Sequence, residues 1–241
     1  MIREQLPLPV VPRDTADLDL FHAGPNAEVL DAVRHLASGA PPRRVLLHGP
    51  VGSGRTHLLQ GAARKAHQAG RRSAYLSLAD DIESPELLDG LDAFDLVCID
   101  DLDARVQEHS WALAVLRLID ALRAHDGAVL LSATLPPEHL PVAMPDLRTR
   151  LSSCAIYALK PLADDDRRAL LQRRAKARGL ELADDVADFL VRRLPRDGAS
   201  LLRALDLLDH ASLTAQRKLT LPFVQSLLVQ ISLESKSEAR S

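Results

Sequence analysis

The chain has 241 residues, 46% of them apolar and only 3% aromatic, which suffices for a core domain with a small appendage buried mainly by aliphatic side chains. The net charge is −3, and neither residues 1–160 nor residues 161–241 carry the basic surplus of proteins that bind DNA by neutralising phosphates, so we expect no direct sequence-specific DNA binding. No stretch has the apolar length of a membrane span or the pattern of a signal peptide, which predicts a cytoplasmic protein with no membrane partner.

The first half of the chain alternates between apolar runs and helical patterns. Residues 1–14 are predicted to be extended, because three prolines deny backbone donors and disfavour helix. Helical spacing follows over 26–36 and 56–69, and again over 108–124. Short apolar runs predict five strands, at Val45–His48, Ser73–Leu78, Leu96–Ile99, Ala128–Ser132 and Ala155–Leu159. Strands that are apolar on both faces and alternate with helices predict an α/β core over 15–160, a five-stranded parallel sheet with helices on both faces.

After Lys160 the pattern is helical only. Apolar spacing predicts helices at Asp164–Arg178, Asp184–Leu194, Ser200–Gln216 and Leu221–Ile231, with interruptions at Gly179, Pro195, Gly198 and Pro222. These segments predict a small all-α domain over 161–233, followed by a polar, disordered tail over 234–241.

A phosphate-binding loop is predicted where the first strand runs into a helix. The pattern comprises Gly49, Gly52, Ser53, Gly54, Arg55 and Thr56. Glycines let backbone N–H groups turn toward a phosphate, the helix amino terminus favours an anion, and the Thr56 hydroxyl is the expected Mg²⁺ ligand. A glycine-rich turn that binds no ligand is the alternative interpretation.

Arg55 occupies the position at which such loops usually carry lysine. A planar guanidinium cannot sit between the terminal phosphates as a compact ammonium does. We therefore expect the loop to bind a diphosphate, and we do not expect efficient ATP hydrolysis by the chain alone.

Two carboxylates, Asp100 and Asp101, follow the third predicted strand. At a strand end beside a phosphate loop, Asp100 is expected to hold Mg²⁺ through water, and Asp101 takes the place of the acid that polarises attacking water. Two aspartates that merely begin a surface turn are the alternative.

Together these motifs resemble the AAA+ family, and within it the DnaA branch. Phe21–Asn26 resembles the segment that encloses adenine, and Leu131–Pro137 resembles the sensor 1 strand, with Thr134 as the sensing group. His57, next to the loop, completes the nucleotide-binding set that the resemblance implies. Pro145–Leu151 resembles the segment that carries an arginine finger, and Arg150 matches the finger itself.

Within this branch the chain resembles the Hda-like regulators. Ala211–Thr220 resembles the end of their lid, and no helix-turn-helix domain follows it. Ala199 stands where the family has its sensor 2 arginine, with Arg196 and Arg203 nearby but out of register, which again argues against rapid turnover.

The amino-terminal tail resembles the peptide by which Hda-like proteins dock on the sliding clamp. The expected clamp contacts are Gln5, Leu6, Leu8, Pro9 and Val10. Prolines stiffen such a peptide and reduce the entropy lost on binding. A tail that packs against its own domain is the alternative.

The resemblance implies a regulator that binds ADP or ATP, with Mg²⁺ as a further ligand, and docks on the β subunit sliding clamp of DNA polymerase III. Arg150 would then stimulate hydrolysis of DnaA-bound ATP in trans, while Arg148 is additional and is expected to pair with a carboxylate or to assist. A solvated surface arginine is the bland interpretation of Arg150. This interpretation is compatible with either a monomer or a homodimer. The alternatives are an autonomous ATPase of helicase-loader type that acts on single-stranded DNA, and a scaffold that binds the clamp but no nucleotide.

Overall fold

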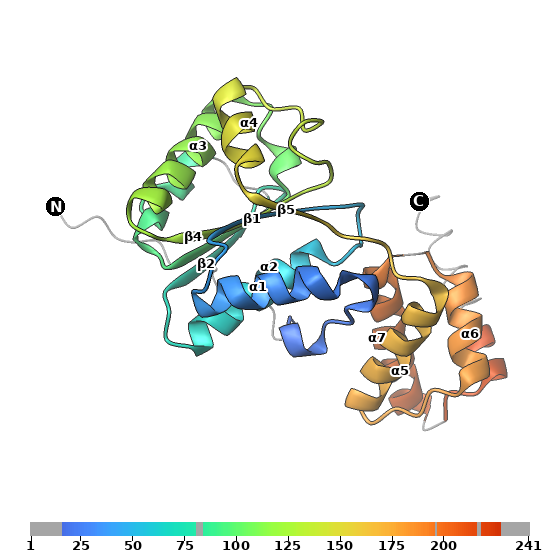
Figure 1. The fold of residues 1–241 in the computed structure, drawn as a ribbon. Coiled ribbons are helices and arrows are strands. Elements are labelled where there is room, and N and C mark those ends of the chain that lie inside the picture. Colours follow the sequence, from blue (N-terminus) through green and yellow to red (C-terminus); the bar gives the residue numbers. More distant parts are fainter. Residues whose placement is uncertain (1–15, 81–83, 196, 216–217, 228–241) are drawn as a thin grey trace. The chain divides into compact units, whose positions relative to one another are not determined.

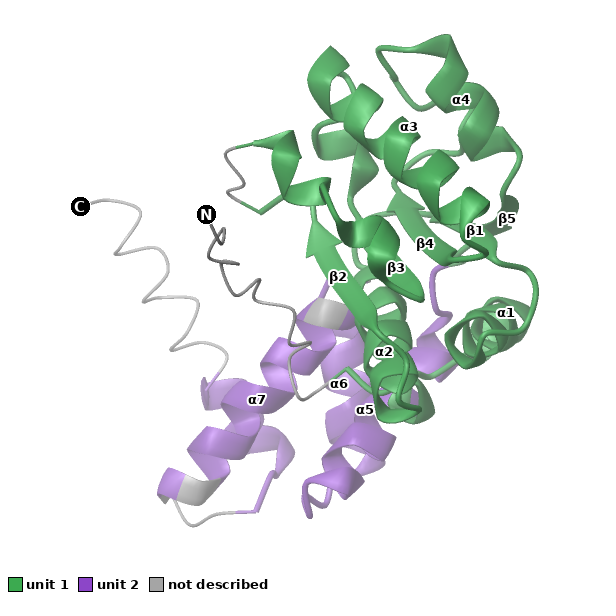
Figure 2. Cartoon of the chain, turned by 90° about the vertical axis from the view of Figure 1, so that its left-hand side faces the viewer, with its two compact units in different colours: residues 1–160 green, residues 161–241 purple. Residues whose placement is uncertain are grey.

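The computed structural model describes residues 16–80, 84–195, 197–215 and 218–227. Two compact units divide between Lys160 and Pro161, and Figure 2 distinguishes them by colour. The predicted clamp-binding tail and the predicted disordered tail lie outside the described residues. None of the helices in the described part of the chain is long and apolar enough to cross a membrane.

The first unit is built on a five-stranded parallel sheet, as the apolar runs predicted. Its strands in spatial order are β2 (Ser73–Ser77), β3 (Leu96–Asp100), β4 (Ala128–Ala133), β1 (Arg44–His48) and β5 (Ala155–Ala158). Every residue of β3 and β4 is buried, whereas the edge strand β5 alternates between half-buried and exposed positions. The continuous apolar runs therefore mark the strands that are covered on both faces.

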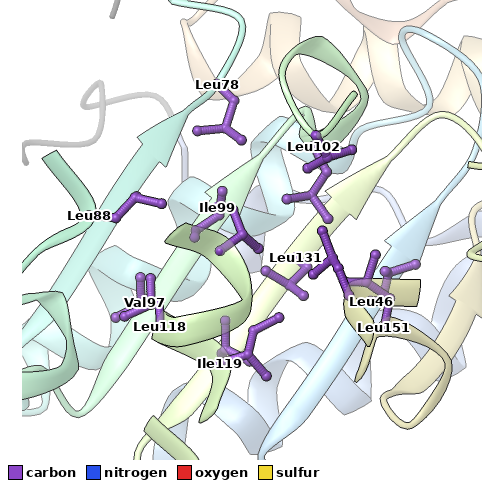
Figure 3. Close-up of a cluster of buried hydrophobic side chains, with 14 of the residues drawn as sticks. Leu46, Leu78, Leu88, Val97, Ile99, Leu102, Leu118, Ile119, Leu131 and Leu151 are labelled. Carbon is purple, nitrogen blue, oxygen red and sulfur yellow. The ribbon is translucent and has the colours of Figure 1, made fainter. Parts of the chain in front are cut away.

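Helices cover both faces of this sheet (Figure 1). One face carries α1 (Ala27–Ser38) and α2 (Arg55–Gln68), and the other carries α3 (His109–Ala124) and α4 (Pro145–Ser152). Figure 3 shows the core beneath α3 and α4, where Ile119 and Leu151 meet Leu46, Ile99 and Leu131 of the sheet. Sequence periodicity did not predict α4 as a helix, because it has only eight residues and buries only Leu147 and Leu151.

The described residues of the second unit form helices and the loops that connect them, and they contain no strand. The unit comprises α5 (Asp164–Ala177), α6 (Asp184–Arg193), α7 (Gly198–Ala215) and a helical segment over 221–227. Gly198 begins α7, whereas the sequence suggested an interruption there. The reason is local: Asp197 caps the helix by accepting a hydrogen bond from the Ser200 N–H at 2.7 Å, which satisfies an amide that has no partner within the helix.

Leucines from all four helical segments fill a separate core in this unit. One arginine of α5, Arg167, is also buried in this unit. Arg167 on α5 donates to the carbonyl oxygens of Val191 at 2.9 Å, Leu194 at 3.2 Å and Pro195 at 2.7 Å, and it pairs with Asp164 at 3.1 Å. Its side chain therefore holds the end of α6 against α5.

Candidate functional site

The predicted nucleotide motifs meet at the carboxyl edge of the sheet. Strand β4 lies between β1 and β3, so the phosphate loop after β1 and the carboxylates at the end of β3 flank the end of β4. The amide of Gly49 donates to the carbonyl oxygen of Ala133 at 3.3 Å, which joins the loop directly to β4. This edge is where parallel α/β sheets bind ligands.

Two glycines of the phosphate loop are required by close packing. A Cβ on Gly49 would lie 2.7 Å from the carbonyl oxygen of Leu159. Gly54 has φ +101°, and a Cβ there would lie 2.8 Å from the ring of Phe21. Only glycine fits at these positions, so the loop can stay close to both the sheet and the preceding segment.

Arg55 is buried at the first residue of α2, with 6% of its surface exposed. One terminal nitrogen, Nη2, lies 3.5 Å from the Asp101 carboxylate. The other, Nη1, is buried without a hydrogen-bond partner, as is the hydroxyl of Ser53, two residues earlier in the loop. Two unpartnered buried polar atoms in one phosphate loop are the pattern expected when an anionic ligand supplies the missing acceptors.

Asp100 is fully buried and heavily hydrogen-bonded within the protein. Its Oδ1 accepts from the Ser132 hydroxyl and, at 3.2 Å, from the Asp101 amide. Its Oδ2 accepts from the Tyr75 hydroxyl at 3.0 Å. Burial raises the pKa of Tyr75, and the negative charge of Asp100 raises it further, so the phenol keeps the proton that it donates.

Asp101 lies at the bend after β3, with φ 53°. Its carboxylate accepts from the Ser77 hydroxyl at 3.4 Å and faces Arg55. Burial and the neighbouring charge of Asp100 raise the pKa of Asp101, and the Arg55 guanidinium partly offsets both effects. The acid expected to polarise water is therefore held by an arginine of the same chain.

Thr134, the expected sensor, follows β4 at the same edge. Both its backbone N–H, at 2.8 Å, and its hydroxyl, at 3.2 Å, donate to the carboxylate of Asp103 in the short helix Leu102–Ala104. Asp103 was not predicted as a site residue. Tyr75 and Ser132 were also missed, although a polar side chain within an otherwise apolar strand was a usable signal.

The segment predicted to enclose adenine, Phe21–Asn26, packs against the first turn of α2. The rings of Phe21 and His57 stack with their centroids 5.8 Å apart. His57 Nε2 donates to the carbonyl oxygen of Asp17 at 2.9 Å, and the Asn26 amide bonds both the N–H and the carbonyl of Lys160. His57 therefore fastens this segment to the helix. Thr56 is exposed at the start of α2.

The expected finger and its neighbour lie on α4, away from these motifs in the chain. Arg150 Nε lies 2.7 Å from the Asp120 carboxylate on α3, and its side chain is 38% exposed. Arg148 donates to the carbonyl oxygens of Pro137 at 2.8 Å and Glu138 at 3.0 Å, so its partners are backbone atoms and not the carboxylate that the sequence suggested.

In the helical unit, Ala199 lies in the first turn of α7, and Arg203 donates to the Ser200 hydroxyl at 2.8 Å. Arg196 lies outside the described residues, as do Gln5, Leu6, Leu8, Pro9 and Val10.

Comparison with known proteins gives one family match and a consistent fold. Residues 164–228 match the family model for the lid domain of Hda. Domain III of the DnaA replication initiator from Thermotoga maritima superimposes with a TM-score of 0.77 at 19% identity, over 89% of this chain and 96% of that one.

Two longer DnaA structures give similar values. DnaA from Aquifex aeolicus bound to AMPPCP has a TM-score of 0.71 at 20% identity, covering 82% of this chain and 66% of that one. A DnaA bound to AMPPCP and single-stranded DNA has a TM-score of 0.72 at 21% identity, covering 82% of this chain and 65% of that one. This chain therefore spans about two thirds of the longer DnaA chains. At these identities the likeness shows the fold, an AAA+ core of the DnaA type followed by a helical lid.

Proposed function

We propose that this chain, an Hda/DnaA-like AAA+ protein, is a negative regulator of replication initiation that holds a nucleotide and stimulates the hydrolysis of ATP bound to DnaA. Its own nucleotide, ADP or ATP, would occupy the loop from Gly49 to Thr56. The unpartnered Ser53 hydroxyl and Arg55 Nη1 support an anionic ligand in that loop.

One observation carries the choice of a regulator over an autonomous ATPase. Arg55 replaces lysine and faces Asp101 at 3.5 Å. A carboxylate oxygen that faces a guanidinium of its own chain is occupied, and is not free to orient attacking water. Binding without efficient hydrolysis is what a regulator with its own bound nucleotide requires.

Arg150 is the group that would act in trans. It is partly exposed on the helix that resembles the finger-bearing segment of the family. A guanidinium placed against the γ-phosphate of a neighbouring molecule stabilises the charge that is redistributed as the bond breaks. DnaA is the partner that the Hda lid and the DnaA fold favour.

The sliding clamp is the second proposed partner, through Gln5, Leu6, Leu8, Pro9 and Val10. Tethering to a clamp on DNA would raise the effective concentration near DnaA, so a weak direct contact would suffice. Leu6→Ala with Leu8→Ala in the full chain should abolish clamp binding in a surface plasmon resonance assay and leave nucleotide binding intact.

The decisive experiment measures hydrolysis of DnaA-bound ATP in the presence of clamp-loaded DNA. Arg150→Ala should lose the stimulation by about tenfold or more, since a trans-acting finger contributes 10³–10⁵ in related reactions. Arg123→Ala, which removes an exposed arginine from α3, is the matched control and should keep it. If the chain alone hydrolyses ATP rapidly and DnaA is unaffected, the regulator is refuted and the helicase-loader type of ATPase becomes the better account.

A further inference from the structure

The residues at the carboxyl edge of the sheet do not fit the magnesium ion that phosphate-loop proteins usually bind with their nucleotide. The sequence pointed to Thr56 and Asp100 as its ligands. Asp100 Oδ1 already accepts from Ser132 and from the Asp101 amide, and Oδ2 accepts from Tyr75 at 3.0 Å. Mg²⁺ demands near-ideal octahedral oxygen geometry, directly or through its waters, so a carboxylate committed to three internal donors is poorly suited to it.

Tyr75 is the residue that occupies the second oxygen of the Asp100 carboxylate. Its hydroxyl lies on β2 and donates to Asp100 on the neighbouring strand β3, so the bond joins two adjacent strands of the sheet. Redirecting Asp100 toward a metal would leave the half-buried phenol without its acceptor. An unsatisfied buried donor is costly, which favours the internal arrangement.

The second carboxylate is also engaged. Asp101 faces Arg55 Nη2 at 3.5 Å and accepts from Ser77 at 3.4 Å. Arg55 is 6% exposed, and its remaining terminal nitrogen, Nη1, has no partner. The guanidinium thus directs one terminal nitrogen at the carboxylate and keeps the other as a donor for an anion. Unlike an ammonium, it stays charged when buried, and its planar fork fixes the directions of both donors.

We infer that this site holds a nucleoside diphosphate without magnesium, with the Arg55 guanidinium supplying the positive charge that the metal supplies elsewhere. The inference rests on the nucleotide site of the proposed function and specifies its ligand. A single fixed cation suits a diphosphate better than a triphosphate, which carries more negative charge to be neutralised. The Ser53 hydroxyl, buried without a partner, is a further donor for the same ligand.

The test compares binding of a fluorescent ADP analogue to the full chain in excess EDTA and in excess MgCl₂, by fluorescence anisotropy. The two dissociation constants should agree within about threefold. Binding that weakens by about tenfold or more in EDTA would overturn the inference and leave the proposed nucleotide site standing. Binding in neither condition would overturn both.

Variants then test whether the named residues are responsible. Combining Arg55→Lys with Tyr75→Phe should free Asp100 Oδ2 and remove the guanidinium from Asp101. We expect these changes to create a magnesium requirement, so that EDTA weakens ADP binding by about tenfold or more. Tyr157→Phe, which alters the chain's other tyrosine on β5, should stay insensitive to EDTA. Circular dichroism checks that each variant is folded. If the double variant is folded, binds ADP and remains insensitive to EDTA, the assignment to Arg55 and Tyr75 is wrong.

Discussion

Arg150 on α4 forms an ion pair with Asp120 on α3, with 2.7 Å between Nε and Oδ1. Both side chains are about two fifths exposed, so water screens the pair and its contribution is about 0.2–1 kcal/mol. The proposed trans-acting arginine is therefore paired within its own chain. This ion pair is weak enough for a phosphate of a neighbouring molecule to replace Asp120 as the partner of Arg150.

This pairing predicts that Asp120→Asn increases the stimulation of DnaA-bound ATP hydrolysis. Losing the competing partner should raise the stimulated rate by up to about fivefold, which corresponds to about 1 kcal/mol. Salt screens exposed charges, so the increase should shrink as ionic strength rises. Asp126→Asn is the matched control, because Asp126 pairs with Arg43 at 3.1 Å and not with α4. A lower stimulated rate for Asp120→Asn would instead mean that Asp120 orients the finger.

The buried guanidinium in the lid predicts a loss of stability. Arg167→Leu would leave the carbonyl oxygens of Val191, Leu194 and Pro195 without their donor, and unsatisfied buried groups cost about 1–3 kcal/mol each before water enters. We expect the lid to lose about 2–4 kcal/mol in urea unfolding followed by circular dichroism. Arg192→Leu, at an exposed position on α6, should change stability by less than about 0.5 kcal/mol. Equal effects of the two substitutions would contradict this account.

The fold was predictable because its signals are local. In β3 the run Leu96–Ile99 is apolar on both faces, and the change to helical spacing after Lys160 marks the second unit. The short helix α4 escaped detection because it buries only two leucines, too few for a helical period to be recognised. A capping aspartate likewise lets a helix begin at a glycine, which the sequence suggested as an interruption.

The site was predictable in its spacing and not in its contacts. The phosphate loop and the acidic strand end follow fixed patterns in the chain. The bonds from Tyr75 and Ser132 to Asp100, and from Thr134 to Asp103, join different strands and loops. These bonds depend on strand order and register, which a single sequence does not specify. For the same reason the partner of Arg150 could not be anticipated.

The cap of α7 predicts a pH-dependent contribution from Asp197. Partial burial raises the pKa of Asp197, but the hydrogen bonds from Ser200 outweigh it, so the pKa lies below its ordinary value of 3.8. A depressed carboxyl pKa contributes stability that is present above pH 3.8 and is lost as the pH falls through the lower, folded-state value.

Asp197→Ala should therefore destabilise the lid by about 1 kcal/mol at neutral pH, the usual value of a helix cap. The difference from the unsubstituted chain, measured by urea unfolding, should shrink as the pH falls below 3.8. Asp197→Asn keeps an acceptor without a titrating group, so its stability relative to Asp197→Ala should not depend on pH. A difference between Asp197→Ala and the unsubstituted chain that persists unchanged in acid would exclude a role for the carboxylate.

Two glycines with positive φ, Gly54 and Gly70, allow a matched test of the contact between the phosphate loop and Phe21. Gly54 has φ +101° and Gly70 has φ +77°, so alanine is strained at both. This strain costs about 1–2 kcal/mol. Only at Gly54 would the added Cβ meet a neighbour, the Phe21 ring at 2.8 Å, whereas nothing lies within 4 Å at Gly70.

We expect Gly70→Ala to lower stability by about 1–2 kcal/mol and to leave ADP binding unchanged, because it alters only the end of α2. Gly54→Ala should cost more and weaken ADP binding by about tenfold or more, because the ring and the loop must move apart at the phosphate site. Thermal unfolding and titration with a fluorescent ADP analogue measure the two effects separately. If Gly54→Ala binds ADP as tightly as Gly70→Ala does, the loop does not need its packing against Phe21 to hold the nucleotide.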